Sequence, residues 1–295
     1  MTIIFLSSQP LDAAQAWMKA LRAALPDDEI VAGPAPEAEI AVVSSPPAGA
    51  LAAHPNLKFI QSTWAGVDGL MADPTLPRHI PLARLIDPEL SAQMAEAVAT
   101  HVLALHRQIP TYRAQQEQEV WRQLPQPPAS ARRIGLLGFG EMARASAAVL
   151  DALGFKVEAW SRSHGDLDVL LARSDIVVNL LPLTPETRGV LNGGVFGRMK
   201  PGAALISAGR GGHLVEADLL AALESGQVSH ATLDVFETEP LPVGHRFWRH
   251  PKITVFPHVA AITEPVSGAR RIAANIRRFR AGEPVEGLVA PGAGY

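Results

Sequence analysis

Residues 133–143 constrain the fold of this chain most strongly, because they join an apolar strand, a glycine turn and the start of a helix. They read RIGLLGFGEMA, and an alanine-rich helical pattern follows as far as Leu153. Gly138 permits a tight turn, Gly140 lets the backbone approach a pyrophosphate, and Ala143 keeps the helix close to the strand. The amino end of that helix offers N–H groups to phosphates. The stretch therefore predicts a dinucleotide-binding βαβ unit, rather than a glycine-rich turn without a ligand.

The next expected strand, residues 156–160, ends in a turn that bears on the choice of cofactor. Enzymes that bind NAD place an acidic residue about 20 positions after the first glycine, on the ribose 2′-hydroxyl. Glu158 has that spacing but falls inside the strand, whereas the strand end carries Ser161, Arg162 and Ser163. An arginine fork and two hydroxyl groups suit a 2′-phosphate, which a carboxylate would repel. We therefore expect NADPH, with NADH less favoured; the alternative is that Arg162 is an ordinary surface side chain.

Short apolar runs alternate with helical patterns in the first third of the chain. Strands are expected at residues 3–6, 40–43 and 57–61, with a helix at 11–24. A second β-α-β series runs from residue 133 to about residue 261. Such alternation produces parallel sheets covered by helices. At about 150 residues per domain, a length of 295 residues predicts two α/β domains, each a doubly wound parallel sheet of the Rossmann or flavodoxin type.

Three further helices are expected outside these strands. Residues 91–107 show a long helical pattern, residues 111–121 a polar one that ends before the prolines at 125–128, and residues 265–281 a last one. The last helix is rich in arginine, which we interpret as a solvated face rather than a nucleic-acid contact. These arginines are Arg270, Arg271, Arg277, Arg278 and Arg280.

Composition excludes several other classes of protein. Apolar residues make up 47% of the chain and charged residues 19%, as in globular proteins with a sizeable core. The net charge of −3 is too balanced for a broad nucleic-acid surface. The chain has no cysteine, which excludes a disulfide scaffold, a cysteine nucleophile and cysteine-ligated metal sites.

The expected location is the cytoplasm, with no membrane or metal partner. The first residues have no basic segment and read as a strand rather than a signal peptide, and no apolar window is long enough for a membrane span. Several histidines show no paired metal-ligand spacing and are expected to be non-functional. They are His101, His106, His213, His245 and His250.

Three later strands end in residues suited to chemistry on a carbonyl group. One ends at a glycine-flanked Arg210, the next in an acidic turn that contains Glu239, and the third at His258. Ligands of open α/β sheets bind outside the carboxyl ends of the strands, so these ends can converge on one crevice. Taken singly, each residue has a structural explanation, such as a bond to helix carbonyls, an exposed acidic turn or a packed histidine. Their combination with a dinucleotide fold favours an active site.

Seven segments, in their order along the chain, resemble the D-isomer-specific 2-hydroxyacid dehydrogenase family, and within it the short NADPH-dependent glyoxylate/hydroxypyruvate reductases. They are WAGVD at 64–68, GFG at 138–140, WSRS at 160–163, LLPLTPET at 180–187, SAGRG at 207–211, LDVFETEPLP at 233–242 and PHVAAIT at 257–263. The resemblance implies a discontinuous substrate domain, residues 1–98 and 264–295. It also implies a Rossmann NAD(P)-binding domain, residues 99–263, with the active site in the cleft between the two.

The resemblance implies that Arg210, Glu239 and His258 are the catalytic residues in the reduction of a 2-oxo acid. Hydride addition to the carbonyl carbon develops negative charge on its oxygen, and Arg210 can bind the carboxylate and polarise the carbonyl. His258 would protonate the oxygen, while Glu239 would hold the imidazole and favour its protonated form. The hydride comes from the cofactor, so the protein positions the reactants and supplies the electrostatic field around them.

The residues that bind cofactor and substrate are likewise implied by the resemblance. Asp234 would contact the nicotinamide carboxamide. The full set expected at the cofactor is Gly138, Phe139, Gly140, Glu141, Met142, Ser161, Arg162, Ser163, Leu181, Pro182, Thr187, Ala208, Gly209, Arg210, Asp234 and His258. The set expected at the substrate is Trp64, Ala65, Gly66 and Arg210. Trp64 departs from the family pattern, which usually has glycine there, and its indole could narrow the pocket or pack between the domains.

Two other functions remain open from the sequence. The chain could be an NAD-dependent dehydrogenase of another substrate, of the D-lactate or phosphoglycerate type. It could also be a non-catalytic regulator that senses dinucleotides. The turn at 161–163 argues against the first, and the complete catalytic set argues against the second.

The helical region at residues 91–121 also carries an expectation about assembly. Its polar second part has few large side chains, so an isolated segment of this kind would fray without a partner to cover it. In relatives this region is the two-fold dimer contact. The resemblance therefore implies a homodimer with Trp121 near the partner's active site, and the alternative is a monomer in which Trp121 caps its own helix.

Overall fold

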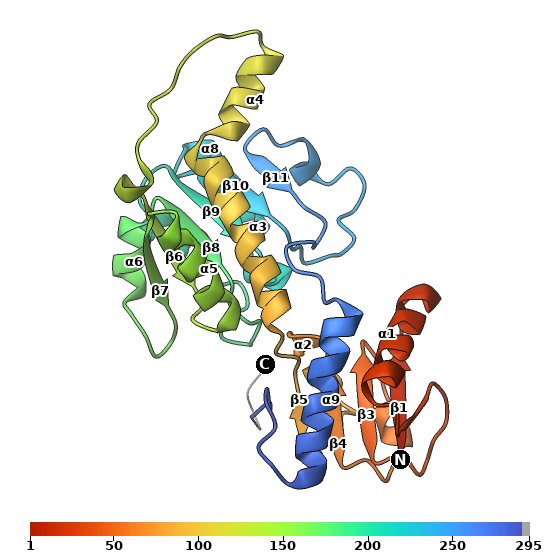
Figure 1. Cartoon of the computed structure of the whole chain (residues 1–295). Helices are drawn as coiled ribbons and strands as arrows, with labels where there is room; N and C mark the ends of the chain where they lie inside the picture. Colours follow the sequence, from red (N-terminus) through yellow and green to blue (C-terminus); the bar gives the residue numbers. More distant parts are fainter. Residues whose placement is uncertain (291–295) are drawn as a thin grey trace. The chain divides into compact units, whose positions relative to one another are not determined.

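The computed structural model describes residues 1–290, and the chain forms two compact units (Figure 1). The first unit consists of Met1–Leu90 and the chain from Thr263 onward, and the second of Ser91–Ile262. The sequence placed these boundaries after residues 98 and 263. The first division therefore lies earlier than expected, inside the first turn of helix α3 (Pro88–His106).

A parallel sheet forms the centre of the first unit. Its strand order is β2-β1-β3-β4-β5. Helices α1 (Leu11–Ala24) and α9 (Pro265–Ala281) cover one face, on alternate strand residues such as Phe5 and Val42. The shorter segments η1 (Leu51–Ala53) and α2 (Asp68–Met71) cover the other face. The strands are β1 (Thr2–Ser7), β2 (Glu29–Val31), β3 (Ile40–Ser44), β4 (Phe59–Ser62) and β5 (Leu82–Ala83).

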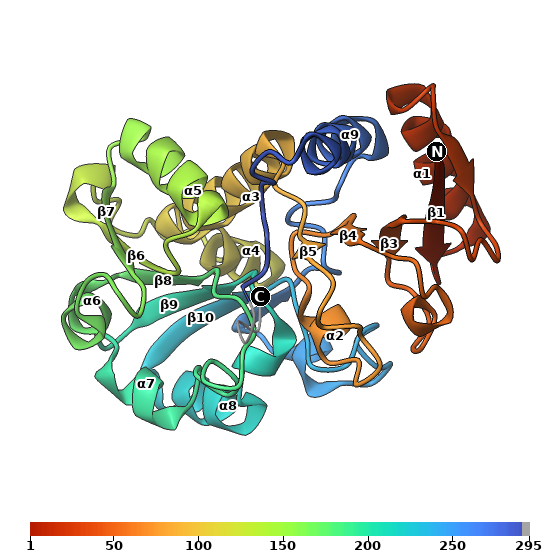
Figure 2. The ribbon, with the colours of Figure 1, turned by 90° about the horizontal axis from the view of Figure 1, so that it is seen from below.

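The second unit has a larger parallel sheet, in the order β11-β10-β9-β8-β6-β7. Helices α3 and α5 (Glu141–Ala152) cover one face, and α6 (Leu167–Arg173), α7 (Gly193–Arg198) and α8 (Glu216–Ser225) cover the other (Figure 2). The strands are β6 (Arg133–Leu137), β7 (Lys156–Trp160), β8 (Ile176–Asn179), β9 (Ala203–Ser207), β10 (Val228–Leu233) and β11 (Ile253–Val255). Short 3-10 turns lie at η2 (Ala129–Ala131), η3 (Gly211–His213) and η4 (Arg246–Arg249).

The two parallel-sheet α/β units confirm the predicted fold class, and the helices expected at 11–24 and 265–281 have those bounds. The strands expected at 3–6, 40–43 and 57–61 are present with ends shifted by a residue or two. The sequence missed β2 and β5. These strands have three and two residues, too few to show a period.

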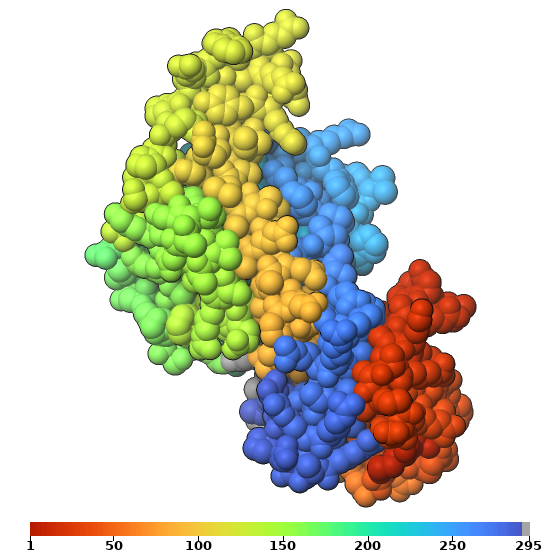
Figure 3. Space-filling view, in the orientation of Figure 1, coloured from red at the N-terminus to blue at the C-terminus, as the bar shows by residue number. Residues whose placement is uncertain are grey.

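The helix expected at residues 111–121 was placed wrongly at both ends. Helix α4 spans Ile109–Glu117, and Glu119 takes the left-handed φ of 55°, so the helix stops before Trp121. The segment after it returns alongside α4: the Leu124 N–H donates to the Tyr112 hydroxyl at 3.0 Å. Trp121 is 96% exposed and lies beyond the end of α4, so its side chain does not cap this helix. In the space-filling view this region protrudes from its unit (Figure 3).

Within residues 1–290, no helix combines the length and the apolar character that crossing a membrane requires.

Candidate active site

All six strands of the second unit end at the same edge of the sheet, because they run parallel, and each end carries residues that the sequence assigned to the site. Gly138 follows β6, Ser161 follows β7 and Leu181 follows β8. The Arg210 turn follows β9. The remaining ends belong to the acidic turn after β10 and to His258 after β11. The sheet therefore gathers the predicted catalytic and cofactor residues of this unit at one edge.

The glycine turn fits a dinucleotide phosphate group. Gly138 has φ +117°, and a Cβ there would lie 3.0 Å from the Leu180 carbonyl oxygen, so only glycine suits this position. Gly140 is the N-cap residue of α5, and no side chain caps that helix end. A Cβ at Gly140 would meet nothing within 4 Å. The first turn of α5 thus presents N–H groups toward open space, as an anion site requires.

Side chains around this turn are ordered by stacking. The Phe139 ring stacks on the His164 ring at 4.5 Å between centroids, and the Arg144 guanidinium lies 4.9 Å from the centroid of the same ring. Glu141 lies opposite Arg144, with 3.4 Å between the charged atoms, and Met142 accepts a hydrogen bond from Ser146 through its carbonyl.

The end of β7 matches the expectation for NADPH. Glu158 lies in mid-strand, where its carboxylate pairs with Arg133 at 2.8 Å, so it is engaged away from the strand end. A tight turn follows, in which the Ser161 N–H donates to His164 O at 2.8 Å. Arg162 extends from this turn with its side chain 61% exposed, and its nearest carboxylate, Glu186, is 4.0 Å away. A hydrogen bond from the Thr184 hydroxyl, with a weaker effect of Arg162, lowers the pKa of Glu186.

The segment after β8 forms a compact loop. The Thr187 hydroxyl donates to Pro182 O at 2.7 Å and accepts the Thr184 N–H at 2.8 Å. The Leu181 N–H donates to the Asn179 side-chain oxygen at 3.3 Å. Thr187 therefore shapes the loop from inside, and Leu181 and Thr187 are both buried.

Two glycines hold the Arg210 turn close to its neighbours. A Cβ at Gly209 would lie 2.9 Å from Leu181 O, and one at Gly211 would overlap the Phe236–Glu237 peptide. The guanidinium of Arg210 donates to Gly209 O at 2.8 Å. The position of Arg210 is therefore set by close backbone approaches that only glycine permits.

The acidic turn after β10 contacts His258 directly. The Glu239 carboxylate accepts a hydrogen bond from the Phe236 N–H at 2.9 Å and pairs with His258 Nδ1 at 2.8 Å. Of the two candidate carboxylates in the turn, Glu237 instead pairs with Arg188 at 2.9 Å. The histidine–carboxylate pair expected from the sequence is thus present, with the second ring nitrogen of His258 away from Glu239.

His101 lies behind this turn and was expected to be non-functional. Its ring packs against Phe256 with 4.5 Å between centroids. Burial lowers the pKa of His101, and the carboxylate of Asp234 opposes part of that shift. These contacts agree with the packing role expected for His101, which stays a prediction.

The predicted substrate segment belongs to the first unit. Trp64 follows β4, its N–H donates to the Ser62 hydroxyl at 3.0 Å, and its carbonyl accepts the Leu85 N–H at 2.9 Å. Its indole nitrogen is buried with no hydrogen-bond partner among the described residues. Within residues 1–290 the N–H groups of Ala65 and Gly66 also donate no hydrogen bond, so the turn can accept a carboxylate.

His213 was expected to be non-functional, and the structure places it against the Arg210 turn. It was set aside because it lacks metal-ligand spacing, yet it is fully buried directly under the Arg210 turn. Its Nδ1 lies 3.2 Å from the Arg210 backbone nitrogen. His213 follows the glycine-flanked arginine by three residues. This spacing was visible in the sequence and indicates a hydrogen bond to the Arg210 turn, although it does not fit a metal site.

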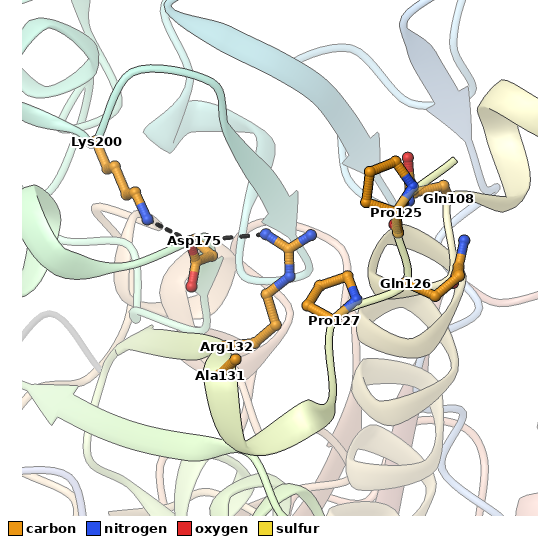
Figure 4. Close-up of a pocket in the computed structure, with 8 residues that line it drawn as sticks. All are labelled: Gln108, Pro125, Gln126, Pro127, Ala131, Arg132, Asp175 and Lys200. Atoms are coloured by element: carbon orange, nitrogen blue, oxygen red, sulfur yellow. Dashed lines mark hydrogen bonds and ion pairs between the residues drawn. The ribbon is translucent and has the colours of Figure 1, made fainter. Parts of the chain in front are cut away.

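A pocket of about 630 Å³ lies at the opposite, amino edge of the same sheet (Figure 4). It is lined by Arg132, Asp175 and Lys200, which precede β6, β8 and β9, and by part of the segment after α4. Asp175 pairs with Lys200 at 2.6 Å and with Arg132 at 3.7 Å. Asp175 offsets one of the two positive charges, and none of the predicted site residues lines this pocket. Among the described residues, no cluster of His, Asp or Glu could hold a metal ion.

The fold and the site together define an α/β protein of the dinucleotide-binding class with a histidine–carboxylate pair. A family model described as "D-isomer specific 2-hydroxyacid dehydrogenase, NAD binding domain" matches residues 99–260. The chain belongs to the D-isomer specific 2-hydroxyacid dehydrogenase family, which confirms the resemblance seen in its motifs.

The relatives at full length agree with the narrower resemblance. The chain is 41% identical to "Glyoxylate/hydroxypyruvate reductase A" from Serratia proteamaculans (strain 568), over 100% of both chains. It is similar to a D-isomer specific 2-hydroxyacid dehydrogenase from Xanthobacter autotrophicus Py2, solved in complex with NADPH and MES. That match has 40% identity, a TM-score of 0.94, and covers 100% of this chain and 99% of the other.

The chain is also similar to a second solved structure, whose name states an activity. That structure is an NADPH-dependent glyoxylate/hydroxypyruvate reductase from Sinorhizobium meliloti in complex with NADP and sulfate. The identity is 36% and the TM-score 0.92, with 100% of this chain and 99% of that chain covered.

Proposed function

We propose that this chain is an NADPH-dependent reductase of small 2-oxo acids, with glyoxylate and hydroxypyruvate as the first candidates. The observation that carries the proposal is the pair of His258 Nδ1 and Glu239 Oε2, 2.8 Å apart, at the sheet edge that also holds the glycine turn. The names of the relatives support the same reaction and the same cofactor.

The chemistry follows from how the ring nitrogens are used. Because Glu239 accepts from Nδ1, the Nε2–H of His258 is the proton to be given to the substrate oxygen. Glu239 stabilises the imidazolium before that transfer. Arg210 binds the substrate carboxylate and polarises the carbonyl. NADPH, when bound, supplies the hydride. Trp64, Ala65 and Gly66 remain the proposed substrate contacts in the first unit.

Several residues would hold NADPH. The free N–H groups at the start of α5 would bind the pyrophosphate, and Arg162 with Ser161 and Ser163 would bind the 2′-phosphate. The buried loop of Leu181, Pro182 and Thr187 would line the cofactor, with Ala208 and Gly209 below it. Asp234 would contact the carboxamide from the end of β10.

A spectrophotometric screen of 2-oxo acids with NADPH and with NADH tests the proposal. We expect NADPH oxidation with glyoxylate or hydroxypyruvate, a higher kcat/KM with NADPH than with NADH, and no turnover by His258→Ala. Turnover of D-lactate with NAD⁺ as the better reaction would favour the alternative dehydrogenase. NADPH binding without turnover of any 2-oxo acid would favour the non-catalytic regulator.

We also propose that the active form is a homodimer in which Trp121 contacts the partner. The indole is 96% exposed, yet hydrogen bonds hold the segment that carries it against α4. A large apolar side chain held rigidly in water suits a protein contact. The cytoplasmic location expected from the sequence remains part of the proposal, and cell fractionation tests it.

A further inference from the structure

His213 lies between two loops that the proposed function uses for different ligands. It ends the short turn η3 (Gly211–His213), three residues after Arg210, and its side chain is fully buried. Fully buried histidines need partners for both ring nitrogens, because an unpaired one costs roughly 1–3 kcal/mol. The partners of His213 therefore show what it does.

The Nδ1 atom of His213 faces two N–H donors. The Arg210 backbone nitrogen lies 3.2 Å away and the Asn179 side-chain nitrogen 3.0 Å away. The Asn179 amide is oriented by its own contacts, since its oxygen accepts the Leu181 N–H at 3.3 Å. Because both neighbours donate, Nδ1 must be unprotonated, and the proton of the ring sits on Nε2.

The Nε2 atom therefore donates, and its acceptor is Pro182 O at 3.1 Å. Pro182 O also accepts from the Thr187 hydroxyl at 2.7 Å. The ring thus links the backbone of Arg210 to the loop around Pro182. In the proposed function Arg210 binds the substrate, and the loop around Pro182 lines the cofactor.

The packing between these loops leaves little room for adjustment. A Cβ at Gly209 would lie 2.9 Å from Leu181 O and 3.1 Å from His213 Nδ1. The Arg210 turn therefore contacts the loop around Pro182 at two places, directly at Gly209 and through the imidazole of His213. A shift of the imidazole would move both.

We propose that His213 is a positioning residue that sets the Arg210 turn through Nδ1 and the Pro182 loop through Nε2. The inference rests on the proposed function. It adds to that function a residue that contacts neither the substrate nor the cofactor. It differs from a space-filling role because the two nitrogens serve different loops and can be removed separately.

Two substitutions separate the nitrogens. The side-chain oxygen of His213→Asn can accept in the place of Nδ1, while Pro182 O loses the imidazole donor and keeps only the hydrogen bond from the Thr187 hydroxyl. The side-chain nitrogen of His213→Gln can donate in the place of Nε2, while the Arg210 N–H loses its acceptor. We expect His213→Asn to raise the NADPH Kd about three- to tenfold with the 2-oxo acid KM little changed. We expect His213→Gln to raise that KM by a similar factor and lower kcat, with the NADPH Kd little changed.

His54 offers a matched control. It is a buried histidine of the first unit whose Nδ1 lies 3.2 Å from Ala35 O. His54→Asn and His54→Gln should lower Tm without changing KM or the NADPH Kd. If both His213 variants keep both constants within about twofold of wild type, or shift them together in proportion to Tm, the inference is overturned.

A second measurement needs no turnover. With ¹⁵N-labelled histidine, the NMR signals of His213 should show the Nε2–H tautomer, and a proton on Nδ1 would overturn the inference. Wild-type turnover is measured first, so that failure of the proposed function is seen separately. If no 2-oxo acid is reduced, the NADPH Kd of His213→Asn, measured by fluorescence, still decides for or against the role of His213.

Discussion

The backbone of His258 is held in a left-handed conformation by Asp234. His258 has φ +56°, and its N–H donates to Asp234 O at 2.9 Å. The Asp234 carboxylate then accepts the N–H groups of Val259 at 2.8 Å and Ala260 at 3.0 Å. A non-glycine residue in this region costs about 1–3 kcal/mol, and these three bonds offset that cost. Asp234 therefore has a role in placing His258 besides the carboxamide contact expected from the sequence.

Replacing Asp234 should impair catalysis through His258. In Asp234→Asn one acceptor becomes a donor that faces a backbone N–H. We therefore expect kcat to fall roughly tenfold to a hundredfold and the free energy of unfolding to fall by about 1–3 kcal/mol. Steady-state kinetics and urea unfolding measure both. Glu237→Gln, which changes an exposed carboxylate bound to Arg188, is the control and should leave kcat near wild type. An unchanged kcat in Asp234→Asn would show that the loop holds His258 without the carboxylate.

The pH dependence of reduction should change in Glu239→Gln. The protonated imidazole of His258 loses the negative charge 2.8 Å from its Nδ1. The pH above which kcat falls should therefore move down. His258→Ala should abolish turnover and leave the NADPH Kd nearly unchanged. If the pH profile of Glu239→Gln matches that of wild type, Glu239 does not act on His258, although no other carboxylate of this turn contacts the ring.

Arg162→Ala should weaken the binding of NADPH and spare that of NADH. A hydrogen bond to a charged group contributes about 1.5–3 kcal/mol, which corresponds to roughly tenfold to a hundredfold in Kd. Arg198→Ala removes another exposed arginine of the same unit, paired with Asp168, and is the control. Fluorescence titration with both cofactors measures the effect. Equal losses for NADPH and NADH would show that Arg162 does not contact the 2′-phosphate.

Glu186 gives an independent test of the same site. It is 4.0 Å from Arg162, and the Thr184 hydroxyl keeps its pKa low, so it is ionised near neutral pH. Glu186→Gln should leave Arg162 without a competing carboxylate and tighten NADPH binding about threefold or less, since both groups are exposed. Weaker binding in this variant would mean that Glu186 orients Arg162 instead of competing for it.

Folding stability should fall in acid because of His230. Burial lowers the pKa of His230 from 6.5 to about 4, with a smaller effect of the nearby His250. The unfolded chain therefore binds this proton more readily than the folded protein. The resulting stability is complete above pH 6.5 and is lost as the pH falls toward 4, by about 2–3 kcal/mol.

Two variants test the role of burial at His230. His230→Gln should flatten the pH dependence of urea unfolding in that window. Thr254→Val removes the hydrogen-bond partner 2.9 Å from His230 Nε2 but keeps the burial, so the pH dependence should persist. A flat profile in Thr254→Val would assign the effect to the hydrogen bond instead.

Strong periodicity and glycine chemistry explain what the sequence predicted of the fold. The glycine turn, β7 and helices α1 and α9 were placed correctly because each has a clear start and stop. β2 and β5 were missed because strands this short carry no pattern. The end of α4 was missed because Glu119 takes a left-handed conformation that no glycine announces.

In the candidate site, too, some features could be predicted from the sequence and others could not. Arg210, Glu239 and His258 could be named from motifs, and the structure pairs the last two. The role of Asp234 under His258 and the two contacts of His213 could not, because they depend on hydrogen bonds between segments far apart in sequence. Spacing along the chain contains no information about such contacts until the strand order is known.

Trp121 should take part in the assembly of the protein. The segment that carries it is fixed to α4, since Gln108 donates to Pro125 O at 2.6 Å and Val120 donates to Gln115 O at 2.8 Å. Trp121 is 96% exposed on this fixed segment.

A chain of 31.4 kDa should therefore sediment and scatter light as a dimer at micromolar concentration. Trp121→Ala should weaken the dimer or, if the indole reaches the partner's site, raise the 2-oxo acid KM with the NADPH Kd unchanged. Leu11→Ala, at an exposed apolar residue of the first unit, is the control and should change neither. A wild-type mass near that of one chain would exclude the dimer. A dimer with unchanged KM in Trp121→Ala would exclude a contribution of the indole to the partner's site.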